Sequence, residues 1–156
     1  MDYINIHFLK TYDWYYHRQG LSEVYKYGLL GSKKLLQLQE SYLNDQNEKD
    51  LKLMIEEAIN TRVAIRNKHP QASNLGHTFG HAVELLSKYS LRHGECVSIG
   101  MAFIAYLSES LKLISPELSA LHIKTLTNLG LPVSYSDAEW PDRLAAMKLD
   151  KKTRGN

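Results

Sequence analysis

The sequence predicts an all-α protein, a bundle of several helices. Apolar residues recur at three- and four-residue spacing over most of the chain, which is the period of an amphipathic helix. Glycine, proline or short polar runs separate these stretches, as expected between helices. Loose alternation of the kind seen in strands occurs at residues 2–9, which we expect to be a short strand or an extended lead-in.

Size and composition indicate one globular domain over residues 1–156. Apolar residues make up 44% of the chain and charged residues 23%, and the formal net charge is +2, too small to indicate nucleic-acid binding. The lone Cys96 excludes an internal disulfide and favours a reducing, cytoplasmic setting. No apolar run approaches the roughly 18 residues of a membrane span, and the first residues do not have the pattern of a signal peptide.

The first helical pattern begins at Thr11. We expect Gly20 to break it, because glycine is a poor helix former. A second apolar and polar pattern at residues 21–30 then predicts another helical segment, interrupted by Gly28 and Gly31.

The next two predicted helices have clear boundary signals. Ser32 is expected to cap a helix that ends before a polar break at residues 44–47. A long amphipathic helix follows over about residues 48–66. Pro70 disfavours its continuation, so residues 67–73 are expected to be a short loop.

The last third of the chain predicts three more elements. Residues 94–113 are apolar nearly all round, so we expect this helix in the core. Pro116 is expected at the first position of the next helix, and Gly130 just after its end. After a linker, Asp137 is expected to cap a final helix that runs to about Lys148.

Three histidines gather in one stretch, NLGHTFGHAVELLSKYSLRH, at residues 74–93. His77 and His81 are four residues apart, which places them on one face of a helix. Each directly follows a glycine, which is unusual in a packing helix and permits close approach to the backbone. His93 opens the next segment. A single histidine on a helix is normally an ordinary packing residue, but three that can converge suggest a metal or an anionic substrate.

The pair His77 and His81 also matches H-x-x-x-H, which zinc proteases share. Thr78 and Phe79 follow the first histidine, so the general base of H-E-x-x-H is absent and a standard zincin is excluded. A carboxylate is the expected third ligand of a catalytic zinc, and GLSEVYKYG offers Glu23. Taken alone, Glu23 and the lysine three residues later resemble a surface ion pair.

Four motifs in order, GLSEVYKYGLL, NLGHTFGHAVE, HGECVSIGM and LDKK, resemble the C-terminal domain of 3-dehydroquinate synthase, a sugar-phosphate cyclase. The resemblance extends from about Phe8 to the end of the chain. It implies a helical domain of a metal- and NAD-dependent lyase of the shikimate pathway, which supplies aromatic amino-acid biosynthesis. That enzyme cyclises a seven-carbon keto-sugar acid phosphate to 3-dehydroquinate and releases phosphate.

The resemblance also implies roles for individual residues. It implies that zinc, or cobalt, is bound by Glu23, His77 and His93. It implies contacts to a phosphorylated sugar acid, and a part in catalysis, for Lys26, Asn74 and His81. One lysine of LDKK, Lys151 or Lys152, is implied as a further substrate contact. Spacing alone would make His77 and His81 both ligands, whereas the resemblance assigns His81 to the substrate; it also suggests a homodimer.

The sequence departs from the family pattern in three places, and these affect the expected binding of NAD and of the substrate. The nucleotide-binding N-terminal domain is absent, since no Gly-rich strand-to-helix turn is found, so we expect NAD to be bound mainly by a domain outside this chain. Pro70 stands where the family carries an arginine for the substrate carboxylate, and Arg66 and Lys68 are the nearest alternatives. The chain also stops soon after LDKK.

Other functions remain open at this point. One alternative is a different cyclase, similar to 2-deoxy-scyllo-inosose synthase or aminodehydroquinate synthase. Another is a non-catalytic helical remnant that binds metal or only a partner protein. A helix-turn-helix DNA-binding protein is disfavoured, because the near-neutral charge provides no basic face.

Overall fold

The computed structural model describes residues 4–150, and every regular element within that range is helical. The predicted all-α class is therefore confirmed. The elements are η1 (Ile6–Thr11), α1 (Trp14–Gly31), α2 (Lys33–Asp45), α3 (Glu48–Lys68), η2 (Pro70–Asn74), α4 (His77–Leu86), α5 (His93–Ser110), α6 (Pro116–Asn128) and α7 (Trp140–Leu149). Across this described range, no helix has the length and apolar character needed to cross a membrane.

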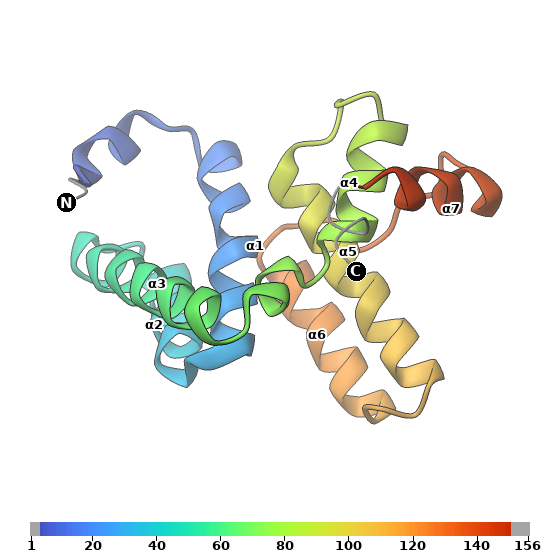
Figure 1. Cartoon of the computed structure of the whole chain (residues 1–156). Helices are drawn as coiled ribbons and strands as arrows, with labels where there is room; N and C mark the ends of the chain where they lie inside the picture. The colour runs from blue at the N-terminus through green and yellow to red at the C-terminus, as the bar shows by residue number, and fades with distance from the viewer. Residues whose placement is uncertain (1–3, 151–156) are drawn as a thin grey trace.

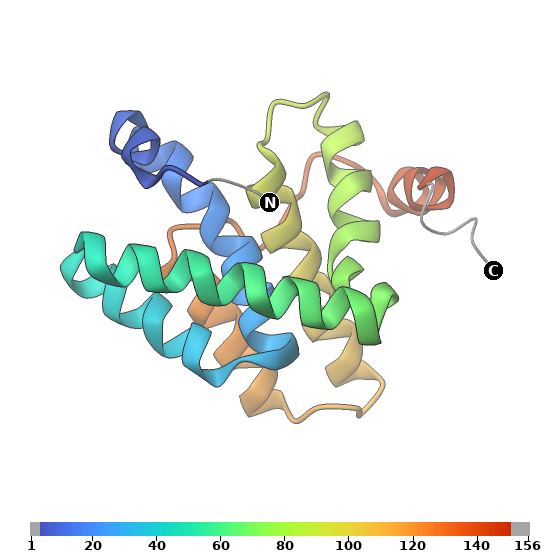
Figure 2. The same ribbon diagram turned by 60° about the vertical axis from the view of Figure 1, so that its left-hand side comes forward.

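The helices form two groups that meet along α1 and α5 (Figure 1). Helices α1, α2 and α3 make up one group, and α4 to α7 make up the other. In Figure 2, α3 crosses the front of the molecule, and its C-terminal end leads through η2 to the base of α4. The two groups therefore meet where α1 packs against α5, and α4 lies against α5 on the second group's side.

The core has two parts. The larger one joins α1, α2, α3, α5 and α6, and its fully buried members include Leu21, Leu35 and Leu126. The smaller one lies between α4 and α5, where the rings of Phe79 and Phe103 stack with centroids 4.1 Å apart. Helix α5 contributes to both parts, which confirms the expectation that it is a core helix, although its last turns are exposed.

Several helix boundaries lie where the local chemistry predicts them. The Ser32 side chain caps α2 by accepting a hydrogen bond from the Leu35 N–H at 3.1 Å. Pro116 occupies the first turn of α6, and Gly130 follows the end of that helix with a φ of 71°, in the left-handed region. These three predictions are confirmed.

Other boundary predictions are wrong. The described part of residues 2–9 contains no strand: it enters η1, whose first turn is capped by the Asn5 side chain. Gly20 does not break α1, because one exposed glycine costs only about 1 kcal/mol, less than the packing of the surrounding helix contributes. Gly28 also lies inside α1.

Two further elements differ from their predicted form. The loop expected after α3 contains a turn of 3-10 helix, η2, which begins at Pro70. The N-cap position of α7 is held by Glu139, whose side chain makes no capping hydrogen bond, and not by Asp137. Pro141 lies in its first turn, and its fixed φ suits that position, so the helix starts just before the proline.

Close backbone contact joins α4 to α5. A Cβ atom on Gly80 would lie 2.9 Å from the carbonyl oxygen of Cys96, and one on Gly100 would overlap the carbonyl oxygen of Gly76. Gly76 itself has a φ of 75°, which other residues rarely adopt. The glycines before the two histidines therefore let α4 lie directly against α5, and this fixes the position of the histidines.

Candidate metal centre

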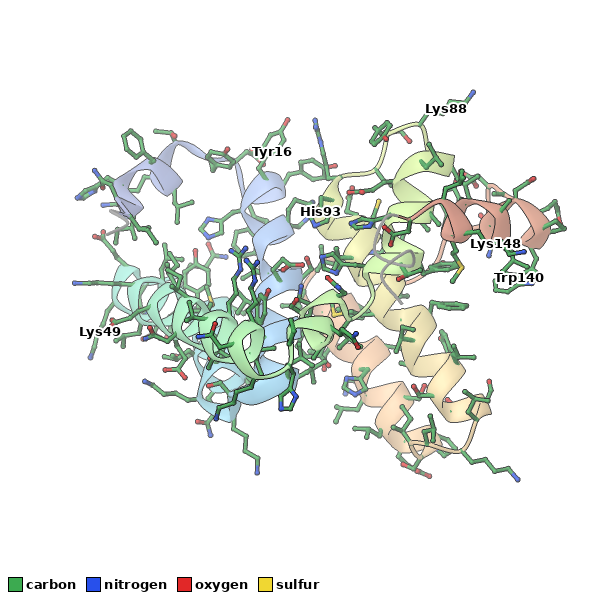
Figure 3. The ribbon with its side chains drawn as sticks, in the orientation of Figure 1. Tyr16, Lys49, Lys88, His93, Trp140 and Lys148 are labelled. Atoms are coloured by element: carbon green, nitrogen blue, oxygen red, sulfur yellow. The ribbon has the colours of Figure 1, made fainter. Side chains whose placement is uncertain are left out.

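Three elements bring the predicted ligands together. Glu23 lies on α1, His77 is the first residue of α4, and His93 is the first residue of α5. One potential ligand atom from each lies within 4.8 Å of the other two. Figure 3 shows His93 at the start of α5, on the side that faces α1. The structure therefore places together the three residues that the resemblance implies as metal ligands.

Local hydrogen bonds hold the first turn of α5 in place. The Glu95 carboxylate accepts from the Arg92 N–H at 2.8 Å, as in a capping box. The Tyr15 hydroxyl of α1 donates to the same carboxylate oxygen at 3.4 Å. Glu95 thus fixes the backbone on which His93 sits and connects it to α1.

The donor atoms fit a bound cation. The Nδ1 of His77 lies 3.1 Å from the Leu75 carbonyl oxygen; a carbonyl only accepts, so Nδ1 carries the proton. In the neutral ring Nε2 then bears the lone pair, and it lies 3.4 Å from Glu23 Oε1. That oxygen is buried and accepts no hydrogen bond from the described residues. His77 Nε2 and Glu23 Oε1 are both electron-pair donors, so a proton or a metal ion between them would stabilise their close approach.

A set of one carboxylate and two imidazoles matches the three protein ligands of many catalytic zinc sites. The hydrogen bond from His77 Nδ1 to a backbone carbonyl is also the usual support of a zinc-binding histidine. The residues present therefore fit zinc.

A second donor set overlaps the first. His81, Glu84 and His93 also offer ligand atoms within 4.8 Å of one another. The three imidazole rings form a cluster, with centroids 5.4 Å apart for His77 and His81, 5.5 Å for His77 and His93, and 6.1 Å for His81 and His93. Proximity alone therefore does not separate His81 from the ligands.

The second oxygen of Glu23 is paired with Lys26. Lys26 Nζ donates to Glu23 Oε2 at 2.8 Å and lies 4.6 Å from the centre of the Tyr27 ring. Lys26 is only 1% exposed, so the two residues are not the surface ion pair that their spacing alone suggests. A buried lysine beside the candidate ligands holds the Glu23 carboxylate in place and adds positive charge to the site.

A pocket of about 540 Å³ opens beside these residues. Its wall includes the three candidate ligands and Lys26, and also two arginines of α3, Arg62 and Arg66. Burial and the nearby Glu23 carboxylate raise the pKa of the Tyr27 phenol, another wall residue, while the two arginines act in the opposite direction. The pocket thus gathers cationic side chains from two helices around a neutral phenol. Its lining residues are Glu23, Lys26, Tyr27, Arg62, Arg66, Pro70, Ser73, Asn74, His77 and His93.

The two arginines lie near Pro70, the position where the family resemblance leads us to expect an arginine. Pro70 lines the pocket but has no charge, and Arg66 lies in the same wall, as one of the two alternatives from the sequence. Lys68, the other alternative, is exposed and is not among the lining residues. Arg62 was missed; it lies one turn before Arg66, on the same side of α3, and this spacing was the available signal.

Of the other predicted substrate contacts, one lines the pocket and one lies outside its wall. Asn74, at the end of η2, lines the pocket. His81 does not, and its Nδ1 lies 3.3 Å from Asp150 Oδ1 just after α7. Asp150 was not predicted as a site residue. Lys151 and Lys152, the candidates from LDKK, lie outside the described residues.

The fold and the site together define a helical domain with a candidate metal centre beside a cationic pocket. The family described as 3-dehydroquinate synthase C-terminal matches residues 20–153. The chain belongs to this family, which confirms the resemblance seen in its motifs.

Individual relatives agree with this assignment. The 3-dehydroquinate synthases of Pseudarthrobacter chlorophenolicus and Corynebacterium diphtheriae are both 37% identical to the chain, over 146 and 147 residues respectively. Each comparison covers 88% of this chain and 40% of the relative, so the chain spans about two fifths of the length of these enzymes.

A solved structure with a similar fold is that of 2-epi-5-epi-valiolone synthase from Streptomyces hygroscopicus, with NAD⁺ and Zn²⁺ bound. The TM-score is 0.82 at 25% sequence identity, over 93% of this chain and 43% of that one.

Proposed function

We propose that this chain is the metal- and substrate-binding domain of a 3-dehydroquinate synthase, a carbon–oxygen lyase that acts on a phosphorylated seven-carbon keto-sugar acid. The observation that carries the proposal is the convergence of Glu23, His77 and His93 on the wall of a cationic pocket. Family membership and the zinc- and NAD-bound structural relative support it. In this proposal the product is 3-dehydroquinate, and phosphate is released.

The proposed metal ligands are Glu23, His77 and His93. Zinc there would polarise substrate oxygens, and NAD, bound mainly by a part of the enzyme outside this domain, would supply the transient oxidation of a substrate hydroxyl. Glu23 keeps one oxygen for the metal, because its other oxygen accepts from Lys26.

The remaining residues would bind the substrate and move protons. Lys26 and the two arginines of α3 supply positive charge for carboxylate or phosphate groups. Asn74 supplies an amide for a substrate hydroxyl or carboxylate. His81, with the Asp150 carboxylate beside one ring nitrogen, is suited to binding phosphate or transferring a proton. A contact from Lys151 or Lys152 and assembly as a homodimer are further parts of the proposal.

A second candidate is a cyclase whose substrate lacks a carboxylate. Pro70 favours it, because it removes the arginine that the family uses for that group. Arg62 and Arg66 favour the first candidate, because they bring two guanidinium groups to the same pocket. We give more weight to the arginines, since a planar guanidinium can bind a carboxylate through two hydrogen bonds.

Phosphate release tests the proposal. The chain is incubated with zinc, NAD and the keto-sugar acid phosphate, alone and with the separately produced N-terminal part of the Pseudarthrobacter relative. Zinc-dependent phosphate release with a carbocyclic acid product, lost in Glu23→Ala, is the expected result. Turnover only of a substrate without a carboxylate would instead select the second candidate. If zinc binds in both mixtures but neither substrate binds or reacts, the chain is a metal-binding remnant and the proposal is wrong.

A further inference from the structure

Two sets of potential ligands compete for the same histidine. His93 belongs to the set with Glu23 and His77 and also to the set with His81 and Glu84. A neutral imidazole has one lone pair for a metal, because its other nitrogen carries a proton. His93 can therefore serve only one of the two sets at a time, and a residue of the protein must determine which.

Glu84 makes a short contact with His93. It lies on α4, and its Oε1 is 2.6 Å from His93 Nδ1. The Glu84 side chain is 19% exposed and that of His93 is 51% exposed, so the carboxylate is the less solvated member of the pair. A carboxylate accepts, so Nδ1 is the donor, and the lone pair of the neutral ring is on Nε2.

This hydrogen bond occupies one potential ligand atom on each of two residues of the second set. Glu84 Oε1 and His93 Nδ1 are both engaged with each other. Nε2 is the remaining nitrogen, and His93 is within reach of Glu23 and His77. A carboxylate that binds the far nitrogen of a metal-binding histidine fixes its tautomer and its orientation, and makes it a stronger donor to the metal.

We propose that Glu84 is the positioning residue of the metal centre. It fixes His93 in the tautomer with a proton on Nδ1, commits that ring to Glu23 and His77, and prevents His81, Glu84 and His93 from acting as a second metal site. The proposal rests on the metal role proposed above for Glu23, His77 and His93. It also gives a physical reason why His81 stays available to the substrate.

Zinc affinity measured against a chromophoric chelator tests this role in the purified chain. Glu84→Ala should weaken zinc binding by about 10–100-fold, the usual effect of losing such a support. Glu84→Gln should lose less, because its amide oxygen still accepts from Nδ1. His81→Ala should bind zinc as the wild type does, and Glu56→Gln, on an exposed position of α3, is the matched control.

Cobalt substitution distinguishes a positioning residue from a direct metal ligand. The visible absorption of the cobalt form should keep its shape in Glu84→Gln, because the three ligands are unchanged. A changed spectrum, together with an equally large loss of affinity in Glu84→Ala and His81→Ala, would make Glu84 a direct ligand in the second set and overturn the proposal.

Two other outcomes separate this inference from the proposed function. Wild-type zinc affinity in Glu84→Ala, with loss of binding in Glu23→Ala, would refute the positioning role alone. Absence of zinc binding in the wild-type chain would refute the proposed metal centre, and the positioning role with it.

Discussion

The contact between Gly80 and α5 leads to a quantitative prediction. In Gly80→Ala the new Cβ would lie 2.9 Å from the carbonyl oxygen of Cys96, whereas ordinary contacts begin at 3.4 Å. Since a backbone carbonyl cannot turn away as a side chain can, α4 and α5 must separate by about 0.5 Å. Overpacking of this kind costs about 1–3 kcal/mol.

Gly20→Ala is the matched control, because a Cβ at Gly20 would meet no atom within 4 Å. Both changes replace glycine by alanine inside a helix, which by itself stabilises by roughly 0.5–1 kcal/mol. Gly20→Ala should therefore be more stable than the wild type, and Gly80→Ala should be less stable than Gly20→Ala by about 1–3 kcal/mol.

Urea unfolding followed by far-UV circular dichroism measures both free energies of unfolding. Zinc affinity provides a second readout, because His77 and His93 lie on the two helices that must separate. Metal–ligand distances tolerate only about 0.2 Å, so a shift of about 0.5 Å should weaken zinc binding by tenfold or more. Equal gains in stability for the two variants, with unchanged zinc affinity in Gly80→Ala, would refute the account of the close α4–α5 contact.

Three further predictions concern other parts of the chain. Burial, with the nearby Glu84 and Glu95 carboxylates, raises the pKa of the Cys96 thiol to about 12, so a thiol reagent at pH 8 should label it only as fast as the chain unfolds. Burial lowers the pKa of His122, so below about pH 6.5 the unfolded chain binds more protons than the folded chain. The free energy of unfolding should therefore fall as the pH drops below about 6.5, and it should fall less steeply in His122→Gln. Urea unfolding at pH 7.5 and pH 5 measures the difference. Arg62→Ala and Arg66→Ala should each weaken calorimetrically measured binding of the keto-sugar acid phosphate by about tenfold or more, while Lys68→Ala leaves it unchanged.

Local chemistry explains which parts of the fold were predictable. The start of α2 at Ser32 and the end of α6 before Gly130 depend on a cap and on a left-handed turn, and both are read from a few adjacent residues. Gly20 was misjudged because helix continuity there depends on packing with distant elements, which outweighs a local propensity.

For the candidate site, the motifs identify the residues, but they do not define how the side chains are oriented. The spacing of His77 and His81 correctly places them near each other, but it does not show which nitrogen of which ring faces Glu23. Arg62 was missed because the side of α3 that faces the pocket is decided by the contact between the two helix groups. The four-residue spacing places Arg62 beside Arg66, but periodicity within one helix does not show that this side of α3 faces the pocket.

The position of the candidate metal centre has a consequence for the whole molecule. Glu23 belongs to the first helix group, while His77 and His93 belong to the second. An ion held by all three would act as a non-covalent cross-link between segments far apart in the sequence. Because binding to the folded form alone adds about 2.7 kcal/mol at a free ligand concentration one hundred times the Kd, the cell's supply of zinc would help to determine how firmly the two groups are joined.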